Sequence, residues 1–189
     1  MIGKRYDRPT QSLSIAIRDL IALGALPESL AGDDAWLDLQ LRNRAHGRYQ
    51  SCYCEQHEVE GEVPVYLELE RSGHTLRISG RIDILDDRLE PPLVIEVKTA
   101  ASLARDPDPI ADHPAHVLQL AYYCRAIEAK TGTRPSGRLV YLVLGESKPR
   151  ELELDLDVWS EQVEELWEGK LESVAALLDR ELGWRDRQT

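Results

Sequence analysis

Three charged side chains in two apolar segments are the residues of this chain best placed to do chemistry. Asp83 lies in the segment 78–85, and Glu96 and Lys98 lie in the segment 93–99. If both segments are β-strands, side chains two residues apart point to the same face, so all three can converge on one side of a sheet. Two carboxylates are costly to remove from water unless a cation compensates them, and carboxylate oxygens suit Mg²⁺ or Mn²⁺ better than zinc. The pattern therefore predicts a site for a divalent metal.

The same pattern has an ordinary structural interpretation. A Glu-x-Lys pair on a strand is often a cross-strand charge pair in solvent, and Glu96 and Lys98 alone do not exclude it. Asp83, from the preceding segment, favours the metal site, and Glu62 is a further acid that can line the same face. Both interpretations stay open at the level of these residues.

Three antiparallel strands in succession are predicted to position these side chains. Residues 62–69 and 74–85 are rich in Val, Ile, Tyr and Leu, and the residues between them have turn composition, which predicts a hairpin. Residues 86–92 end in two prolines that cannot continue a ladder, so 93–99 is expected to be a third strand. The face opposite the charged side chains is expected to consist of Ile78, Ile82, Ile84, Ile95 and Val97.

Helices are predicted before and after these strands. Apolar spacing predicts a helix over 10–23, and the two aspartates at 33–34 can cap a second helix that runs to about Tyr49. Residues 100–114 are rich in Pro and Asp, a composition suited to a mobile loop over a site. A further helix is expected over 116–130, before Gly132.

The remaining elements complete the order ααβββαββα. Strands are predicted over 139–144 and 151–156, and Asp157 can cap a last helix whose apolar stripe runs from Trp159 to Leu178. That stripe is either core packing or a surface for a partner helix. The order predicts a single α/β domain over 1–189 with a central mixed β-sheet flanked by helices. Its expected parts are N-terminal helices over 1–50, a core over 62–156 and a C-terminal amphipathic helix over 157–189.

Composition places the chain among folded globular proteins. It has 189 residues, of which 42% are hydrophobic and 30% charged, which fits one domain and argues against disordered and collagen-like chains. The longest apolar run, 139–144, is far below the ~20 residues of a membrane span, and no signal-peptide pattern begins the chain. Three cysteines are an odd count without a disulfide framework. We therefore expect a cytoplasmic protein.

The charge distribution leaves room for a phosphate-binding surface. The net charge of −11 by itself argues against nucleic-acid binding, but residues 151–189 carry twelve acidic residues against four basic ones. Arg42, Arg44 and Arg48 surround His46 with no acid between them. They form either a basic patch for DNA or an ordinary solvated helix face.

Three short motifs, in order, resemble those of the RecB-like branch of the PD-(D/E)XK nuclease superfamily. This branch includes CRISPR-associated RecB-like exonucleases and helicase-linked nuclease domains. Residues 80–83 (GRID) are similar to the family's G-x-x-D motif, residues 95–99 (IEVKT) to E-x-K, and residues 119–123 (QLAYY) to Q-x-x-x-Y. The resemblance covers about residues 46–156.

The resemblance implies a restriction-endonuclease-like core and metal-assisted hydrolysis of phosphodiester bonds. Asp83 and Glu96 would ligate Mg²⁺ or Mn²⁺ together with the backbone carbonyl of Val97. Lys98 would orient or help deprotonate the attacking water and stabilise charge at the phosphate.

The resemblance also implies roles for residues outside the metal strands. Gln119 and Tyr123 are i and i+4 on one helix face and would support the site and contact the DNA strand. Glu62 resembles the acid of the family's first core strand. Relatives often carry a further histidine ligand upstream, and His46 is the nearest histidine here, either as that ligand or as a solvent-facing helix residue.

Other residues depart from the family or allow a plain interpretation. No cysteine follows Cys124, so the iron-sulfur cluster of several relatives is not expected. Cys52 and Cys54 form a lone C-x-C pair, which is more typical of unliganded thiols than of a zinc site. Tyr122 can stack on a base or pack in the core.

The residues and the resemblance together predict a Mg²⁺- or Mn²⁺-dependent DNA nuclease. Exonuclease action is the commoner role among the similar proteins, with single-stranded or duplex ends as substrates in DNA repair, recombination or defence. The alternative is a catalytically weak nuclease-like subunit that binds DNA or docks on a separate helicase or CRISPR complex. The filled catalytic positions disfavour that alternative, whereas the small size and the acidic last helix favour it.

Overall fold

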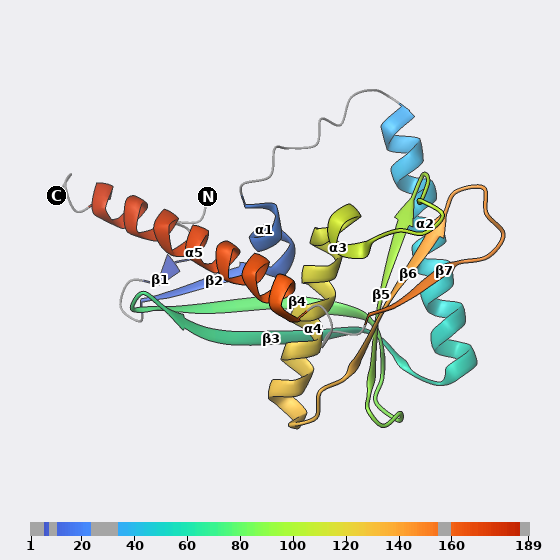
Figure 1. Ribbon diagram of the computed structural model, residues 1–189, viewed down its shortest axis with the longest axis horizontal. Coiled ribbons are helices and arrows are strands. Elements are labelled where there is room, and N and C mark those ends of the chain that lie inside the picture. Colours follow the sequence, from blue (N-terminus) through green and yellow to red (C-terminus); the bar gives the residue numbers. More distant parts are fainter. Residues whose placement is uncertain (1–5, 8–10, 24–33, 155–159, 186–189) are drawn as a thin grey trace.

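A mixed seven-stranded sheet runs through the computed structural model, which describes residues 6–7, 11–23, 34–154 and 160–185. The strand order is β1-β2-β4-β5-β6-β7, and β3 pairs with β4 beside this path (Figure 1). The elements are β1 (Tyr6–Asp7), β2 (Ser12–Ala16), α1 (Ile17–Ala22), α2 (Asp34–His57), β3 (Glu60–Arg71), β4 (His74–Asp86), β5 (Leu93–Ala100), α3 (Pro109–Asp112), α4 (Pro114–Thr131), β6 (Ser136–Val143), β7 (Arg150–Leu154) and α5 (Ser160–Arg185). The predicted α/β class and the mixed sheet are confirmed.

Two hydrophobic cores lie on opposite faces of β5 and β6. Val94 of β5 belongs to the larger core, which also includes buried residues of α1, α4 and α5, whereas its neighbour Ile95 belongs to the smaller core. Tyr49 and Tyr53 of α2 pack against the smaller core. Alternation along the strands thus gives α4 one face of the sheet and α2 the other.

The strand β4 organises the sheet, because it has different partners along its two edges. Along one edge it pairs antiparallel with β3 over nearly its whole length. Along the other edge it pairs parallel with β2 at residues 75–79 and antiparallel with β5 at residues 84–86. Residues 80–83 therefore face a gap on this edge, where no strand among the described residues pairs with them.

The predicted hairpin and the three consecutive antiparallel strands are confirmed. The hairpin turns at Ser72 (φ 50°) and Gly73 (φ 77°), and two adjacent positive φ angles are what a two-residue turn needs to match the twist of its strands. Glycine adopts this conformation without steric cost.

The prediction of a helix over residues 10–23 is wrong in its first half. Ser12–Ala16 is the strand β2, in which Leu13 and Ile15 are buried and Ser14 is exposed, and the helix begins only at Ile17. The two-residue alternation prevails over the helical spacing because β2 pairs in parallel with β4. The first 50 residues are therefore not all helical.

The predicted end of the second helix is wrong. It continues past Tyr49 to His57, since Tyr53 and Cys54 on its later turns pack against the smaller core. Figure 1 shows this long helix crossing beside β5, β6 and β7.

The prediction that Ile78, Ile82 and Ile84 of β4 lie on one apolar face is wrong for Ile84. Ile78 and Ile82 lie in the larger core, but Ile84 lies in the smaller core beside Ile95. The face changes where β4 leaves the gap and begins to pair with β5. Asp83 is thus placed at a break in the regular ladder.

The last helix packs on the larger core through its apolar stripe. Val163, Trp167, Leu171, Val174 and Leu178 are buried, which supports the packing interpretation of the stripe. The predicted cap Asp157 and the start of the stripe at Trp159 lie outside the described residues.

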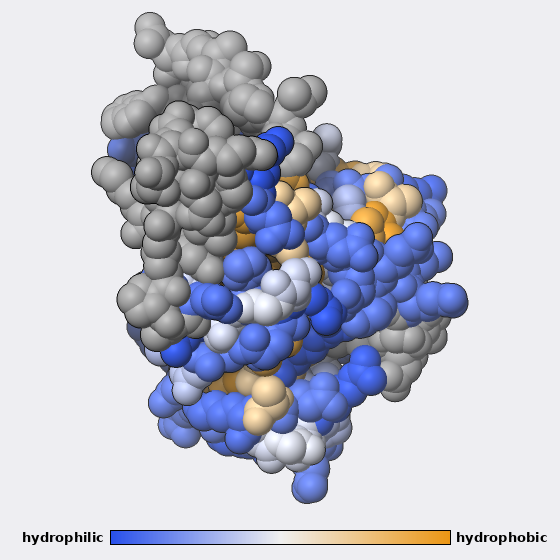
Figure 2. All heavy atoms as spheres, turned by 90° about the vertical axis from the view of Figure 1, so that its left-hand side faces the viewer, coloured by the Kyte–Doolittle hydropathy of each residue, from blue (hydrophilic) through white to orange (hydrophobic). Residues whose placement is uncertain are grey.

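The surface is mainly polar on the face that Figure 2 shows, where hydrophobic residues form only small separate patches. Among the helices that the structure describes, none combines the length and apolar character that a membrane crossing requires.

Candidate active site

Glu96 and Lys98 of β5 meet Gln119 of α4 on the face of the sheet that α4 covers. The Lys98 Nζ donates to Glu96 Oε1 at 2.6 Å and to Gln119 Oε1 at 2.8 Å. Glu96 is 2% exposed, so its charge is removed from water and faces the lysine ammonium. The expected convergence of these two strand residues is confirmed.

A hydrogen-bonded chain continues from Gln119 to the gap in the sheet. Gln119 Nε2 donates to the hydroxyl of Tyr123, one turn later on α4, at 2.9 Å. The same hydroxyl lies near the backbone N–H of Arg81, in the stretch of β4 that has no partner strand on this edge, and this N–H opposes the rise that burial causes in the pKa of the hydroxyl. Tyr123 therefore fixes the amide of Gln119 and places its hydroxyl beside the part of β4 that has no partner strand on this edge.

Asp83 joins β4 to β5 through its side chain. Its Oδ2 accepts from the backbone N–H of Val97 at 2.8 Å, and its Oδ1 lies 3.4 Å from Nε2 of His46 on α2. Its backbone carbonyl accepts from Gln50 Nε2 at 2.6 Å. The carboxylate is held at the end of the regular β4 and β5 pairing, pointing to the same region as Glu96 and Lys98.

Glu62 lies opposite Asp83 in an unusual backbone conformation. Its φ is 57°, a region that residues other than glycine seldom occupy, and the β3 and β4 register has no pair at this position. Its carboxylate accepts from Gln50 at 3.3 Å and from Arg81 at 3.1 Å. Such local strain is concentrated at functional sites.

The donor atoms suit a hard divalent cation. His46, Glu62 and Asp83 each offer a ligand atom, and these atoms all lie within 4.8 Å of one another. The Oε2 atom of Glu96 is buried and has no hydrogen-bond partner. A buried carboxylate oxygen without a partner is costly, and a cation bound between Glu96 and Asp83 would satisfy it. These residues therefore fit a metal ion.

Burial and neighbouring charges shift two titrating groups of the site. Desolvation raises the pKa of the Glu96 carboxyl to about 7, with a further increase from the Asp83 charge that Lys98 and His46 oppose. The hydrogen bond to Asp83 raises the pKa of the His46 imidazole, against the effect of burial. Both shifts favour the protonated form of the group.

These residues line an open cavity of about 480 Å³ that contains both acidic and basic side chains. Arg18 of α1 and Arg81 of β4 contribute to its wall together with Lys98. The cavity is lined by Arg18, Asn43, His46, Gly47, Gln50, Glu62, Arg81, Asp83, Glu96, Val97, Lys98, Thr99 and Gln119.

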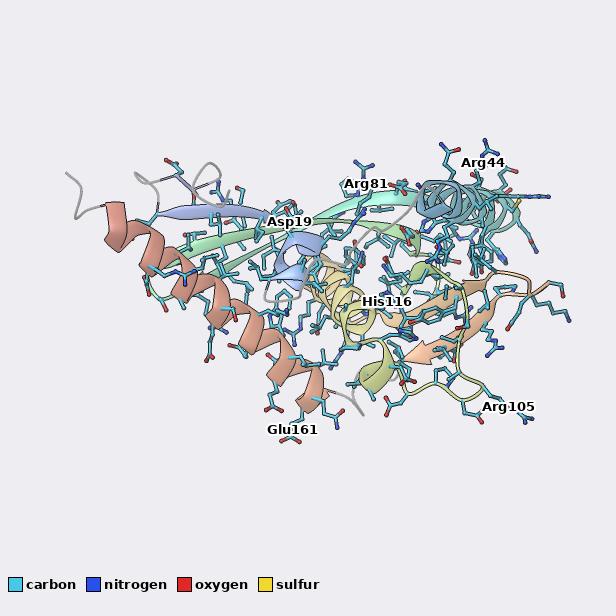
Figure 3. The ribbon with its side chains drawn as sticks, turned by 90° about the horizontal axis from the view of Figure 1, so that it is seen from above. Asp19, Arg44, Arg81, Arg105, His116 and Glu161 are labelled. Atoms are coloured by element: carbon cyan, nitrogen blue, oxygen red, sulfur yellow. The ribbon has the colours of Figure 1, made fainter. Side chains whose placement is uncertain are left out.

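The structure places the three arginines predicted to contact DNA outside the cavity, so their role stays a prediction. Arg42, Arg44 and Arg48 do not line the cavity, because α2 turns Asn43, His46, Gly47 and Gln50 toward it. Figure 3 shows Arg44 projecting from the outer side of α2.

Tyr122, by contrast, is too deeply buried to stack on a base. It is 0% exposed, and its hydroxyl donates to the carbonyl of Ile78 at 2.7 Å. Its ring packs beside Trp167 of α5 with centroids 6.0 Å apart, so it is a core residue.

Sequence reasoning missed Gln50, Arg18 and Arg81 as parts of the site. Gln50 follows His46 by four residues, so the two share a helix face, a signal that required the helix to continue beyond Tyr49. Arg81 lies inside the first motif. Arg18 reaches the cavity only because β2 and α1 sit beside β4, which no local pattern reveals.

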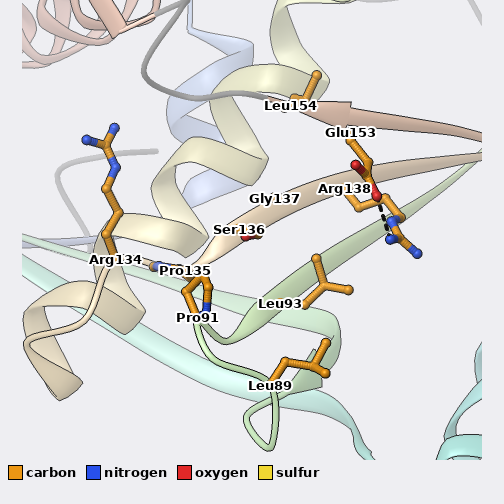
Figure 4. Close-up of a pocket in the computed structure, with 10 residues that line it drawn as sticks. All are labelled: Leu89, Pro91, Leu93, Arg134, Pro135, Ser136, Gly137, Arg138, Glu153 and Leu154. Carbon is orange, nitrogen blue, oxygen red and sulfur yellow. Dashed lines mark hydrogen bonds and ion pairs between the residues drawn. The ribbon is translucent and has the colours of Figure 1, made fainter.

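A second groove, of about 600 Å³, lies at the other end of β5 and β6 (Figure 4). Its one carboxylate, Glu153, is bound to Arg138 at 2.7 Å. It therefore lacks the grouped acids of the site above. The cysteines are free thiols, with Cys52 exposed, Cys54 half-buried and Cys124 buried.

One family model and one solved structure agree with this architecture. The family model described as the PD-(D/E)XK nuclease superfamily matches residues 4–186. The crystal structure of SSO0001 is similar over 84% of this chain and 75% of its own, with a TM-score of 0.54 and 23% identity, a likeness of fold. A candidate exonuclease from Eubacterium rectale is similar over 75% of this chain and 54% of its own, with a TM-score of 0.47 and 15% identity. A search of curated proteins returned no match.

Proposed function

The chain belongs to the PD-(D/E)XK nuclease superfamily, and on that premise we propose that it is a divalent-metal-dependent DNA nuclease of the RecB-like branch, acting as an exonuclease. The observation that carries the proposal is the buried, unpartnered Oε2 of Glu96 next to Asp83 and the hydrogen-bonded Lys98. The order of the three motifs, at residues 80–83, 95–99 and 119–123, supports the branch.

We assign Mg²⁺ or Mn²⁺ to Asp83 and Glu96, with His46 and Glu62 as further protein ligands. The Val97 carbonyl, which the motif also suggests, stays a prediction. When bound, such an ion polarises the phosphoryl oxygens and lowers the pKa of a water nucleophile.

The protein's own residues supply a fixed cation beside the acids. An ammonium group has three donors, and Lys98 uses two of them on Glu96 and Gln119, which leaves one for a water or a phosphate oxygen. Gln119 and Tyr123 are positioning residues, since they act on Lys98 through hydrogen bonds. Lys98 then orients the attacking water and stabilises the charge that develops on the phosphate.

The substrate we propose is DNA with a free end, single-stranded or duplex, in repair, recombination or defence. The cations Arg18 and Arg81 at the wall of the cavity support a polyanionic substrate despite the acidic total charge. We place this activity in the cytoplasm, either alone or with a separate helicase or CRISPR protein.

The test is cleavage of end-labelled single-stranded, linear duplex and closed circular DNA with Mg²⁺, with Mn²⁺ and with chelator. Lys98→Met should reduce metal-dependent cleavage by at least about 10²-fold. Lys130→Met, which removes an exposed lysine at the far end of α4, should leave it unchanged.

Each outcome decides between the candidate functions. Loss of linear but not circular DNA would support an exonuclease, and cleavage of circles would replace it with an endonuclease. Absence of cleavage of any substrate with either metal would overturn the enzyme proposal and favour the docking subunit.

A further inference from the structure

Arg81, a cation of the cavity wall, is bound to Glu62, which forms the metal-binding group together with His46 and Asp83. Arg81 Nη1 donates to Glu62 Oε2 at 3.1 Å, and the two side chains are 65% and 52% exposed. Figure 3 shows Arg81 projecting from the sheet beside α2. The backbone of Arg81 is held in the sheet by its pairing with Pro64 of β3, so its side chain is the part that can change partner.

Glu62 is shared between this arginine and the metal-binding group. One of its ligand atoms lies within 4.8 Å of those of His46 and Asp83, while Gln50 Nε2 contacts its Oε1 at 3.3 Å. A guanidinium and a divalent cation repel each other, so both do not bind one carboxylate with full strength. Uptake of a metal by Glu62 therefore weakens its contact with Arg81.

We propose that Arg81 couples metal uptake to substrate binding. It holds Glu62 when no metal is bound and binds a backbone phosphate of the DNA once Glu62 has turned to the ion. A guanidinium forms paired hydrogen bonds with phosphate oxygens, and this one is exposed at the wall of the cavity. The inference rests on the proposed function and adds a residue that positions the substrate.

The same two strands provide a matched contact without the metal-binding residues. Arg77 of β4 binds Glu68 of β3 at 2.9 Å, with side chains 53% and 50% exposed. Arg77 and Arg81 are four residues apart on one strand, so they share a face of the sheet. Arg77→Gln therefore removes the same charge and a similar cross-strand pair, away from the cavity.

The first measurement is calorimetric titration of the DNA-free protein with Mn²⁺. Arg81→Gln should bind Mn²⁺ about two- to fivefold more tightly than wild type, the range expected for loss of one exposed ion pair. Arg77→Gln should bind as wild type does. Arg18→Gln removes another cation of the cavity, so an equal gain there would overturn the proposal in favour of general repulsion.

The second measurement is binding of a fluorescein-labelled single-stranded oligonucleotide, in a Lys98→Met background that prevents cleavage. In Mn²⁺, Arg81→Gln should bind the DNA several-fold more weakly, and the slope of log K against log salt should decrease by about 0.7 for one lost phosphate contact. In chelator, where Arg81 is held by Glu62, the change should be smaller.

Opposite signs in the two titrations are the signature of the coupling, because a merely structural role would weaken both. Tighter Mn²⁺ binding without weaker DNA binding, or equal DNA effects with and without Mn²⁺, would overturn it. Cleavage by the wild-type protein separates the two claims. If the wild-type protein cleaves DNA but Arg81→Gln does not change Mn²⁺ and DNA affinity in opposite directions, the proposed function is supported and the coupling is refuted. If the wild-type protein does not cleave DNA, the proposed function is refuted whatever the titrations give.

Discussion

Adding one methyl group at Gly80 should disturb both the core and the site. A Cβ at this position would lie 2.6 Å from Cε1 of Tyr123 and 3.0 Å from Cε1 of Tyr122, and the first distance is shorter than real Cβ contacts allow. Both rings are at most 1% exposed, so neither can move into solvent. Their hydroxyls are also bound, to Ile78 and to Gln119. Neither ring can therefore move away from the added methyl group without losing packing or a hydrogen bond.

The sign of the change in the free energy of unfolding shows whether the added methyl group clashes. Without steric conflict, Gly→Ala at a permitted φ stabilises a protein by about 0.4–1 kcal/mol through the unfolded chain. Overpacking of a filled core costs about 1–3 kcal/mol, so Gly80→Ala should lower the free energy of unfolding by that amount. Movement of Tyr123 reaches Lys98 through Gln119, and a misplacement of about 1 Å can cost about 10²-fold in rate.

Urea unfolding in chelator measures the stability, and the DNA cleavage assay measures the rate. Gly137→Ala is the matched control, because its Cβ would meet the flexible end of Leu120 at 3.1 Å, and it should cost less. In a Tyr123→Leu background, which removes the ring, the cost of Gly80→Ala should fall by at least about 0.5 kcal/mol. A Gly80→Ala protein as stable as wild type, or one equally destabilised in both backgrounds, would refute the reasoning.

Three further predictions concern buried polar groups. Burial raises the pKa of Glu96 from 4.5 to about 7, so the free energy of unfolding of the metal-free protein should decrease as pH rises through this window. Urea titrations with chelator should show that Glu96→Gln removes this decrease, which is roughly 3 kcal/mol at most. Burial lowers the pKa of His116 from 6.5 to about 4, so its neutral form, bound to the Tyr141 hydroxyl at 2.9 Å, should stabilise the protein fully above pH 6.5 and progressively less toward pH 4. His116→Gln should flatten this part of the stability profile, and an unchanged slope would contradict the assignment. Tyr122→Phe should cost about 1 kcal/mol through the lost bond to Ile78 yet leave DNA affinity unchanged, whereas weaker DNA binding at unchanged stability would restore its stacking role.

The parts of the site that sequence reasoning found are those that local periodicity determines. Glu96 and Lys98 share a face because they are two residues apart on a strand, and Gln119 and Tyr123 share one because they are four apart on a helix. Both relations hold wherever the elements lie in space. The hairpin was equally predictable, since its turn needs the backbone that a Ser-Gly pair readily adopts.

The parts that it missed depend on contacts between distant segments. Leu13 and Ile17 fit a helical stripe as well as they fit a strand followed by a helix, and only the parallel pairing of β2 with β4 decides between them. The side change at Ile84 likewise follows from the exchange of β2 for β5 as the partner of β4. Both features depend on where β2 lies along β4, and these two strands are far apart in the sequence, so no local pattern of residues reveals them.

The gap along β4 explains why the first motif requires a glycine and the third a tyrosine. Where the pairing with β2 has ended and the pairing with β5 has not begun, β4 has no partner strand on this edge, and the Tyr123 hydroxyl lies near the backbone N–H of Arg81 there. A Cβ at position 80 would collide with the ring that carries this hydroxyl, so the position requires glycine. The same hydroxyl accepts from Gln119, which in turn accepts from Lys98. The tyrosine that packs against β4 at this gap is thus part of the chain that orients the lysine, so the gap in the sheet and the fixed ammonium beside it belong to one arrangement.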